Sequence, residues 1–129
     1  MMDHFSLHVK DYARSKEFYT KALKPLGYTL SVEYGTAGGF KEGGHTSFWI
    51  VKKERVEPTH LAFRGKNAKA VKDFHSAALA AGGTDNGAPG PRPDYSPDYY
   101  AAFVFDPDGH NIEAMCFEEP TKKSIKKKK

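Results

Sequence analysis

The feature that most constrains the fold is an internal repeat. Residues 4–27 align without a gap with residues 60–83, which places His4 opposite His60. The two segments share seven identical residues in 24 positions, and these identities run through a strand pattern, a helix pattern and a terminal glycine. Such self-similarity indicates a duplicated structural unit rather than a chance likeness of two amphipathic helices. We therefore expect one domain over residues 1–118, with two modules at about 1–55 and 56–118.

Each repeat predicts a strand followed by a helix. The opening residues alternate between apolar and polar side chains, which is typical of a half-buried strand. Asp11 and Asn67 then stand where a helix N-cap belongs. Gly27 in the first repeat and the pair at 82–83 in the second are typical helix ends.

Strand patterns follow each helix. A Pro-Asp-Gly turn at 106–109 separates the last two, because proline presets φ and glycine accepts positive φ. A proline-rich segment, 87–97, is long enough to be a functional loop. The expected strands are 28–34, 38–41 and 46–52 in the first module, and 83–86 (weak), 99–105 and 110–117 in the second. The fold class is thus α+β, with two βαβββ modules.

Composition and charge exclude several classes of function. The net charge is +4, but six lysines lie at the carboxyl terminus, so residues 1–121 alone carry −2. A like-charged terminal run is typically disordered, so we expect residues 119–129 to be a basic disordered tail and expect no nucleic-acid partner. No apolar run approaches the roughly 20 residues of a membrane span. Cys116 is the sole cysteine, which favours a reducing, cytoplasmic location.

Two histidines and one glutamate form a candidate metal site. If the modules pack about a pseudo-twofold axis, the equivalent residues His4 and His60 would face each other across a cleft. Glu113 lies on the last expected strand and shares a face with Asn111 and Met115. Two imidazoles and one carboxylate bind divalent metals and leave positions open for substrate. Taken singly, each of these side chains is more often a capping or solvated group.

Further residues are candidates for substrate binding. His8 shares a strand face with His4, so its side chain either enters the cleft or lies exposed near the strand end. Trp49, the single tryptophan, either lines the cleft or packs in the core.

The proline-rich segment and the strand after it add three more candidates. Arg92, Tyr99 and Tyr100 suit recognition of an anionic or aromatic ligand, the alternative being a stiff loop packed on the sheet. Tyr99 and Tyr100 are adjacent in a strand, so only one of them can face the cleft.

These motifs resemble those of the vicinal oxygen chelate superfamily, which includes glyoxalase I, fosfomycin-resistance and bleomycin-resistance proteins, and extradiol dioxygenases. The resemblance lies in the segments 4–27, 60–63 and 105–113, and it extends over nearly all of residues 1–118. It implies paired βαβββ modules that form a curved mixed sheet around a metal cleft. It also implies that His4, His60 and Glu113 are the metal ligands.

The sequence departs from glyoxalase I at one position. That enzyme carries a second glutamate, both ligand and proton-transferring base, on the last strand of the first module. The matching residue here is Phe48 or Trp49, and neither side chain binds metal. The site is therefore expected to have three ligands, as in the fosfomycin-resistance and dioxygenase branches.

The resemblance implies a metal-dependent enzyme acting on a small, oxygen-chelating substrate. We expect a lyase or isomerase, in which Glu113 is also the catalytic carboxylate, with one divalent ion of Zn, Mn, Ni or Fe. The alternatives are an extradiol-type dioxygenase, a drug-binding protein of the bleomycin-resistance type, and a metal-free relative that serves as a binding or structural domain. The family's frequent dimers imply a homodimer.

Overall fold

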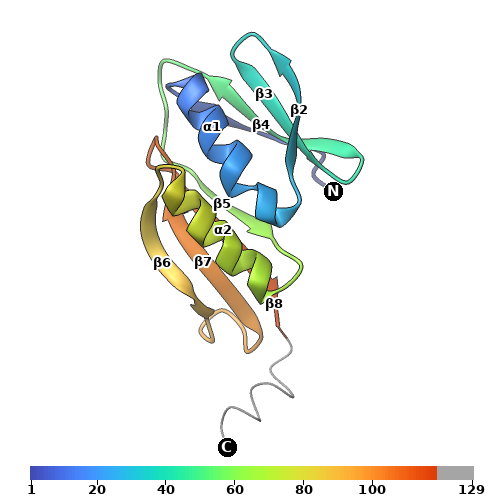
Figure 1. Ribbon diagram of the computed structural model, residues 1–129, viewed down its shortest axis with the longest axis vertical. Coiled ribbons are helices and arrows are strands. Elements are labelled where there is room, and N and C mark those ends of the chain that lie inside the picture. Colours follow the sequence, from blue (N-terminus) through green and yellow to red (C-terminus); the bar gives the residue numbers. More distant parts are fainter. Residues whose placement is uncertain (119–129) are drawn as a thin grey trace, which may run out of the picture.

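The computed structural model describes residues 1–118, and the expected basic tail at 119–129 lies outside this range. Two modules occupy the two halves of the molecule (Figure 1). The first consists of β1 (Phe5–Val9), α1 (Tyr12–Ala22), a 3-10 turn η1 (Lys24–Leu26), β2 (Thr29–Tyr34), β3 (Ala37–Glu42) and β4 (His45–Lys52). The second consists of β5 (His60–Arg64), α2 (Ala68–Ala80), β6 (Thr84–Pro91), β7 (Tyr99–Phe105) and β8 (Asn111–Phe117).

Each module forms its own mixed sheet. The strand orders are β1-β4-β3-β2 and β5-β8-β7-β6, so the two sheets have the same topology. In each sheet the first strand runs parallel to the last, and the remaining neighbours are antiparallel. The α+β class and the two βαβββ modules are confirmed. The two sheets remain separate and do not close into one curved sheet within residues 1–118.

Local sequence signals explain where the helices begin and end. The side chains of Asp11 and Asn67 accept hydrogen bonds from the backbone N–H groups of Arg14 and Ala70, as the N-cap prediction requires. At the other ends, Gly27 follows η1 with a φ of 91°, and Gly82 follows α2 with a φ of 104°. Positive φ at these positions favours glycine, which has no Cβ to clash.

One face of each sheet is covered by its helix, and the other is left open. Buried side chains from both sheets and both helices form a single core, which includes Phe18, Tyr19, Phe40, Phe74 and Ile112. Because side chains alternate along a strand, the neighbours of these core residues point to the uncovered side. We call these surfaces the open faces.

A buried polar network joins the modules. The Tyr19 hydroxyl of α1 donates to Oδ2 of Asp106 in the β7–β8 turn. In the same turn, His110 lies with its Nε2 2.8 Å from the carbonyl oxygen of His8. From the sequence, a histidine directly after the Pro-Asp-Gly turn is expected near the surface, but His110 is fully buried.

The proline-rich segment differs from its prediction. β6 extends to Pro91 and pairs with β7 with two register shifts, so only residues 92–98 form a connecting loop. Proline has no backbone N–H group to donate. The prolines of β6 are tolerated because β6 is an edge strand, with a neighbouring strand on one side only. Within residues 1–118 no helix has the length and apolar character needed to span a membrane.

Candidate functional site

His60 and Glu113 meet on the open face of the second sheet. The parallel register pairs His60 with Asn111 and Ala62 with Glu113, so the two functional side chains point to the same side. His60 Nε2 lies 3.1 Å from Glu113 Oε1. The histidine side chain is half exposed, whereas the carboxylate is only 4% exposed. The pair thus combines an accessible imidazole with a buried anion.

The second nitrogen of His60 fixes its tautomer. His60 Nδ1 lies 3.1 Å from the Asn111 carbonyl oxygen, which can only accept, so Nδ1 must donate. In the neutral ring, Nε2 then points a lone pair at the Glu113 carboxylate. Two acceptors 3.1 Å apart repel each other unless a cation lies between them or Nε2 is protonated. A backbone carbonyl that orients an imidazole in this way is a common support for a metal ligand.

The distance between the two acceptors fits a shared metal ion. Zinc binds nitrogen and oxygen ligands at about 2.0–2.2 Å, which separates two ligand atoms by roughly 2.8–3.6 Å when the angle at the metal is between about 90° and 109°. The 3.1 Å between His60 Nε2 and Glu113 Oε1 falls in this range. The spacing of these two atoms is therefore compatible with a shared divalent ion.

Tyr99 completes the surroundings of the carboxylate. Its hydroxyl donates a 2.5 Å hydrogen bond to Glu113 Oε2. Partial burial, together with the hydrogen bond and charge of Glu113, raises the pKa of Tyr99 well above its usual range. Tyr99 therefore stays protonated and remains a donor at neutral pH.

His4 does not join this pair within one chain. It lies just before β1, exposed, with Nδ1 2.8 Å from Asp3 Oδ1. The far end of β1 contacts the second module, because His110 bridges the His8 carbonyl and the Thr59 backbone N–H next to His60. In the described part of the chain, the ligand atoms of His4, His60 and Glu113 do not all come within 4.8 Å of one another. The three-ligand arrangement of His4, His60 and Glu113 is therefore not assembled within residues 1–118 of one chain, and their role as metal ligands stays a prediction.

A second group of ligand atoms occurs in the β7–β8 turn. Among residues 1–118, only Asp106, Asp108 and His110 bring three such atoms within 4.8 Å of one another. Asp106 Oδ1 accepts backbone N–H bonds from Asp108 and His110, and its Oδ2 accepts from Tyr19.

Both ring nitrogens of His110 in this group also have hydrogen-bond partners. Its Nδ1 accepts from Thr59 N–H, and its Nε2 donates to the His8 carbonyl. Because Asp106 and His110 already bond to the protein, this group holds the turn and the modules together and is a poor metal site.

The register resolves which residue replaces the second glutamate. Glu113 pairs with Ala62 of β5, and Trp49 pairs with Ser6 of β1, which is the repeat equivalent of Ala62. Trp49, not Phe48, therefore occupies the matching place. Trp49 lies on the open face of the first sheet, where its ring stacks on Tyr34 at 6.2 Å and 12°. His8 also faces this side and is exposed.

The remaining candidates for substrate binding, Tyr99, Tyr100 and Arg92, have different surroundings. Tyr99 faces Glu113, whereas Tyr100 packs against the hydrophobic core on the helix side. The Arg92 guanidinium donates to the carbonyls of Ala88, Gly90 and Pro91 and lies over the Phe103 ring at 5.4 Å. Ligand binding by Arg92 and Tyr100 stays a prediction, and these contacts count against it.

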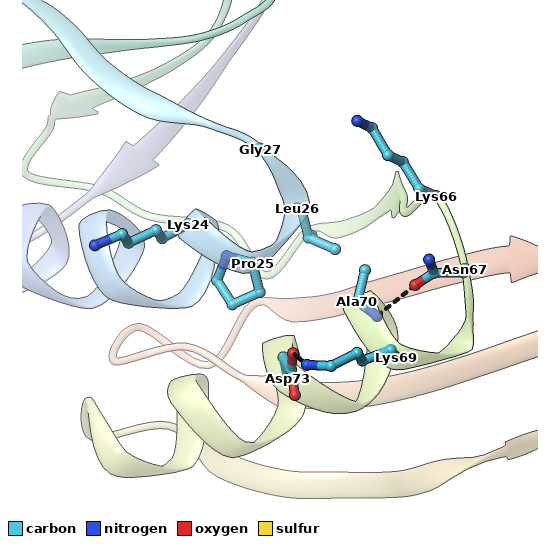
Figure 2. Close-up of a pocket in the computed structure, with 9 residues that line it drawn as sticks. All are labelled: Lys24, Pro25, Leu26, Gly27, Lys66, Asn67, Lys69, Ala70 and Asp73. Carbon is cyan, nitrogen blue, oxygen red and sulfur yellow. Dashed lines mark hydrogen bonds and ion pairs between the residues drawn. The ribbon is translucent and has the colours of Figure 1, made fainter.

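A surface hollow of about 300 Å³ lies elsewhere, between η1 and the start of α2 (Figure 2). Lys24, Lys66 and Lys69 line it, and Lys69 is paired with Asp73 at 2.7 Å. Asn67 in the same hollow is occupied as the α2 N-cap. None of the predicted site residues lines it, so this hollow does not mark the proposed metal site.

Sequence reasoning missed two features of the site. The sequence could not show that the Asn111 carbonyl orients His60, because this contact follows from the pairing of β5 with β8 and not from the Asn111 side chain. The buried position of His110 was hidden because its partners, His8 and Thr59, are distant in sequence. A histidine directly after a Pro-Asp-Gly turn was the available signal, and it predicted a surface position.

The family model for the glyoxalase/bleomycin resistance protein/dioxygenase superfamily matches residues 1–114. A search of curated protein sequences gives no significant match. Among solved structures, a glyoxalase/bleomycin resistance protein from Albidiferax ferrireducens is 28% identical, with a TM-score of 0.80, over 90% of this chain and 98% of that one.

Two further structures show the fold alone. A glyoxalase/bleomycin resistance protein/dioxygenase family enzyme from Burkholderia phytofirmans is 17% identical, with a TM-score of 0.70, over 89% of this chain and 97% of that one. A glyoxalase-related enzyme from Fulvimarina pelagi is 18% identical, with a TM-score of 0.69, over 90% and 87% of the two chains.

Proposed function

Since the chain belongs to the glyoxalase/bleomycin resistance protein/dioxygenase superfamily, we propose that it is a metal-dependent enzyme acting on a small substrate that presents two oxygen atoms. The observation that carries this proposal is the His60–Glu113 pair, in which His60 Nε2 lies 3.1 Å from Glu113 Oε1. We assign His60 Nε2 and Glu113 Oε1 as ligands of one divalent ion, of Zn, Mn, Ni or Fe.

We further propose that His4 of a second copy supplies the third ligand. His4 lies exposed just before β1, and its ligand atoms do not join those of His60 and Glu113 within 4.8 Å in the described part of one chain. Both sheets have an open face, and a homodimer can bring the start of β1 of one copy to the open face of the other copy's second sheet. A twofold dimer would form two equivalent sites in this way.

When bound, the metal would act as a Lewis acid that stabilises negative charge on a substrate oxygen. The residues around it have separate tasks. His60 is oriented by its Nδ1–H bond to the Asn111 carbonyl. Glu113 supplies the buried negative charge and is the proposed catalytic carboxylate, because it would adjoin the reacting atoms.

The open face of the first sheet would supply contacts to substrate. Trp49 and Tyr34 present a stacked pair of rings there, and His8 adds an exposed imidazole nearby. In the proposed dimer this face would lie opposite the metal. We favour a lyase or isomerase reaction. The aromatic pair also suits a planar drug-like ligand, as expected for a binding protein of the bleomycin-resistance type.

The first experiment measures metal content after growth and dialysis with divalent metals. We expect about one ion per chain in the wild type, and loss of the ion in His60→Ala and Glu113→Gln. His45→Ala, which changes another exposed histidine, should retain it. A metal-free wild type would overturn the proposal. Consumption of O₂ during turnover would identify a dioxygenase instead of a lyase or isomerase.

The second experiment tests where His4 comes from. His4→Ala and His60→Ala, each measured by itself, should fail to retain the ion. Mixed and reassociated as dimers, they should recover about a quarter of the sites, because half of the dimers are hybrids with one intact site. No recovery, despite confirmed subunit exchange, would contradict ligation by a second copy.

A further inference from the structure

The two oxygens of Glu113 have different partners. Oε1 faces His60 Nε2 at 3.1 Å, whereas Oε2 accepts the Tyr99 hydroxyl at 2.5 Å. The Glu113 side chain is almost fully buried. A free carboxylate can present either oxygen, or both, to a metal ion. Here a protein donor already occupies one of them.

The Tyr99 ring is itself held in place. The Tyr95 ring packs edge-on against it at 5.0 Å, and the Phe117 ring packs edge-on at 5.7 Å. The Arg64 guanidinium in turn lies 4.9 Å from the centre of the Phe117 ring. These contacts fix the direction from which the hydroxyl approaches Glu113. The hydrogen bond is therefore part of a packed arrangement rather than one orientation of a mobile side chain.

We propose that Tyr99 is a positioning residue, which holds Glu113 so that only Oε1 is presented to the metal ion. This inference rests on the proposed function, because it concerns the same metal site. Tyr99 makes the carboxylate a one-oxygen ligand. It thereby leaves one more coordination position for substrate than two-oxygen ligation would leave. Partners of this kind commonly change metal affinity by 10- to 100-fold.

The test compares Tyr99→Phe, which removes the hydroxyl and keeps the ring, with Tyr95→Phe. Tyr95 packs on the same ring but donates no hydrogen bond to Glu113. Zn²⁺ binding to the apo-protein is measured by calorimetry. The visible d–d absorption of bound Co²⁺ is measured in parallel, because its intensity falls as coordination number rises. Circular dichroism confirms that both variants are folded.

We expect Tyr99→Phe to bind Zn²⁺ about 10- to 100-fold more weakly. The affinity falls because the carboxylate is no longer held in the orientation that presents Oε1, and this loss outweighs a second bond from Oε2. The Co²⁺ band should also be weaker, because the freed Oε2 raises the coordination number. Tyr95→Phe should match the wild type in both measurements. If Tyr99→Phe has the wild-type affinity and the wild-type Co²⁺ band, the role of Tyr99 is overturned while the metal site stands. If the wild type binds neither ion, the proposed function fails, and the role of Tyr99 fails with it.

Discussion

Trp49 occupies in the first module the place that Glu113 occupies in the second. Each pairs with the equivalent residue of its parallel neighbour, Ser6 of β1 and Ala62 of β5. The duplicated scaffold therefore carries a carboxylate in one module and an aromatic ring in the other. This asymmetry leaves one carboxylate for the proposed metal site.

Restoring the missing carboxylate should strengthen metal binding. Trp49→Glu places an anion where the second module has Glu113, so it adds a fourth ligand to the proposed set. We expect metal affinity to rise about tenfold, which corresponds to about 1.4 kcal/mol. Competition with a chromophoric chelator measures the affinity. The control is Trp49→Gln, because glutamine has nearly the same shape as glutamate but no charge. Equal metal affinities in the two variants would contradict the prediction.

Removing His110 should destabilise the fold. Its ring bonds the Thr59 N–H and the His8 carbonyl at a fully buried position. His110→Ala leaves both backbone groups unsatisfied and opens a cavity. We expect a loss of about 2–4 kcal/mol in the free energy of unfolding.

Urea denaturation measures this loss, and His45→Ala provides an exposed control. Metal content should be unchanged in folded His110→Ala. Full stability combined with loss of the metal would show that the β7–β8 turn, rather than the His60–Glu113 pair, binds the ion.

The raised pKa of Asp106 should make the stability of the fold depend on pH. Burial raises the pKa of this carboxyl above its usual value of 3.8, against the opposing effects of the Tyr19 hydrogen bond and His110. The folded state then binds the proton more tightly than the unfolded state, so Asp106 lowers the free energy of unfolding as pH rises from about 3.8 through its folded pKa.

Asp106→Asn removes this titration and keeps a similar shape. Its amide oxygen can accept the backbone N–H bonds of Asp108 and His110, and its amide nitrogen can donate to the Tyr19 hydroxyl. The stability of the variant relative to the wild type should therefore increase with pH. Urea unfolding over a pH series measures the difference, with Asp73→Asn as an exposed control. A difference that is constant or decreases with pH would contradict the assignment.

Much of the candidate site could be predicted from strand alternation alone. The repeat identified His60, and the alternation in β8 placed Glu113 on a face with Asn111. The alternation could not choose between Tyr99 and Tyr100, or between Phe48 and Trp49. The choice between the two tyrosines depends on which face of the second sheet a helix covers, and the choice between Phe48 and Trp49 depends on the register of β4 against β1.

The sequence by itself determined the local elements of this protein. Capping by Asp11 and Asn67, glycine at positive φ and the period of apolar residues involve neighbours along the chain, so they can be recognised without a partner. Only the tertiary structure decided how the modules join. His110 is buried because two backbone groups that are distant in the sequence meet it, and through the His8 carbonyl it joins the end of β1 to the second module. Such contacts depend on the packing of whole modules, which no local pattern encodes.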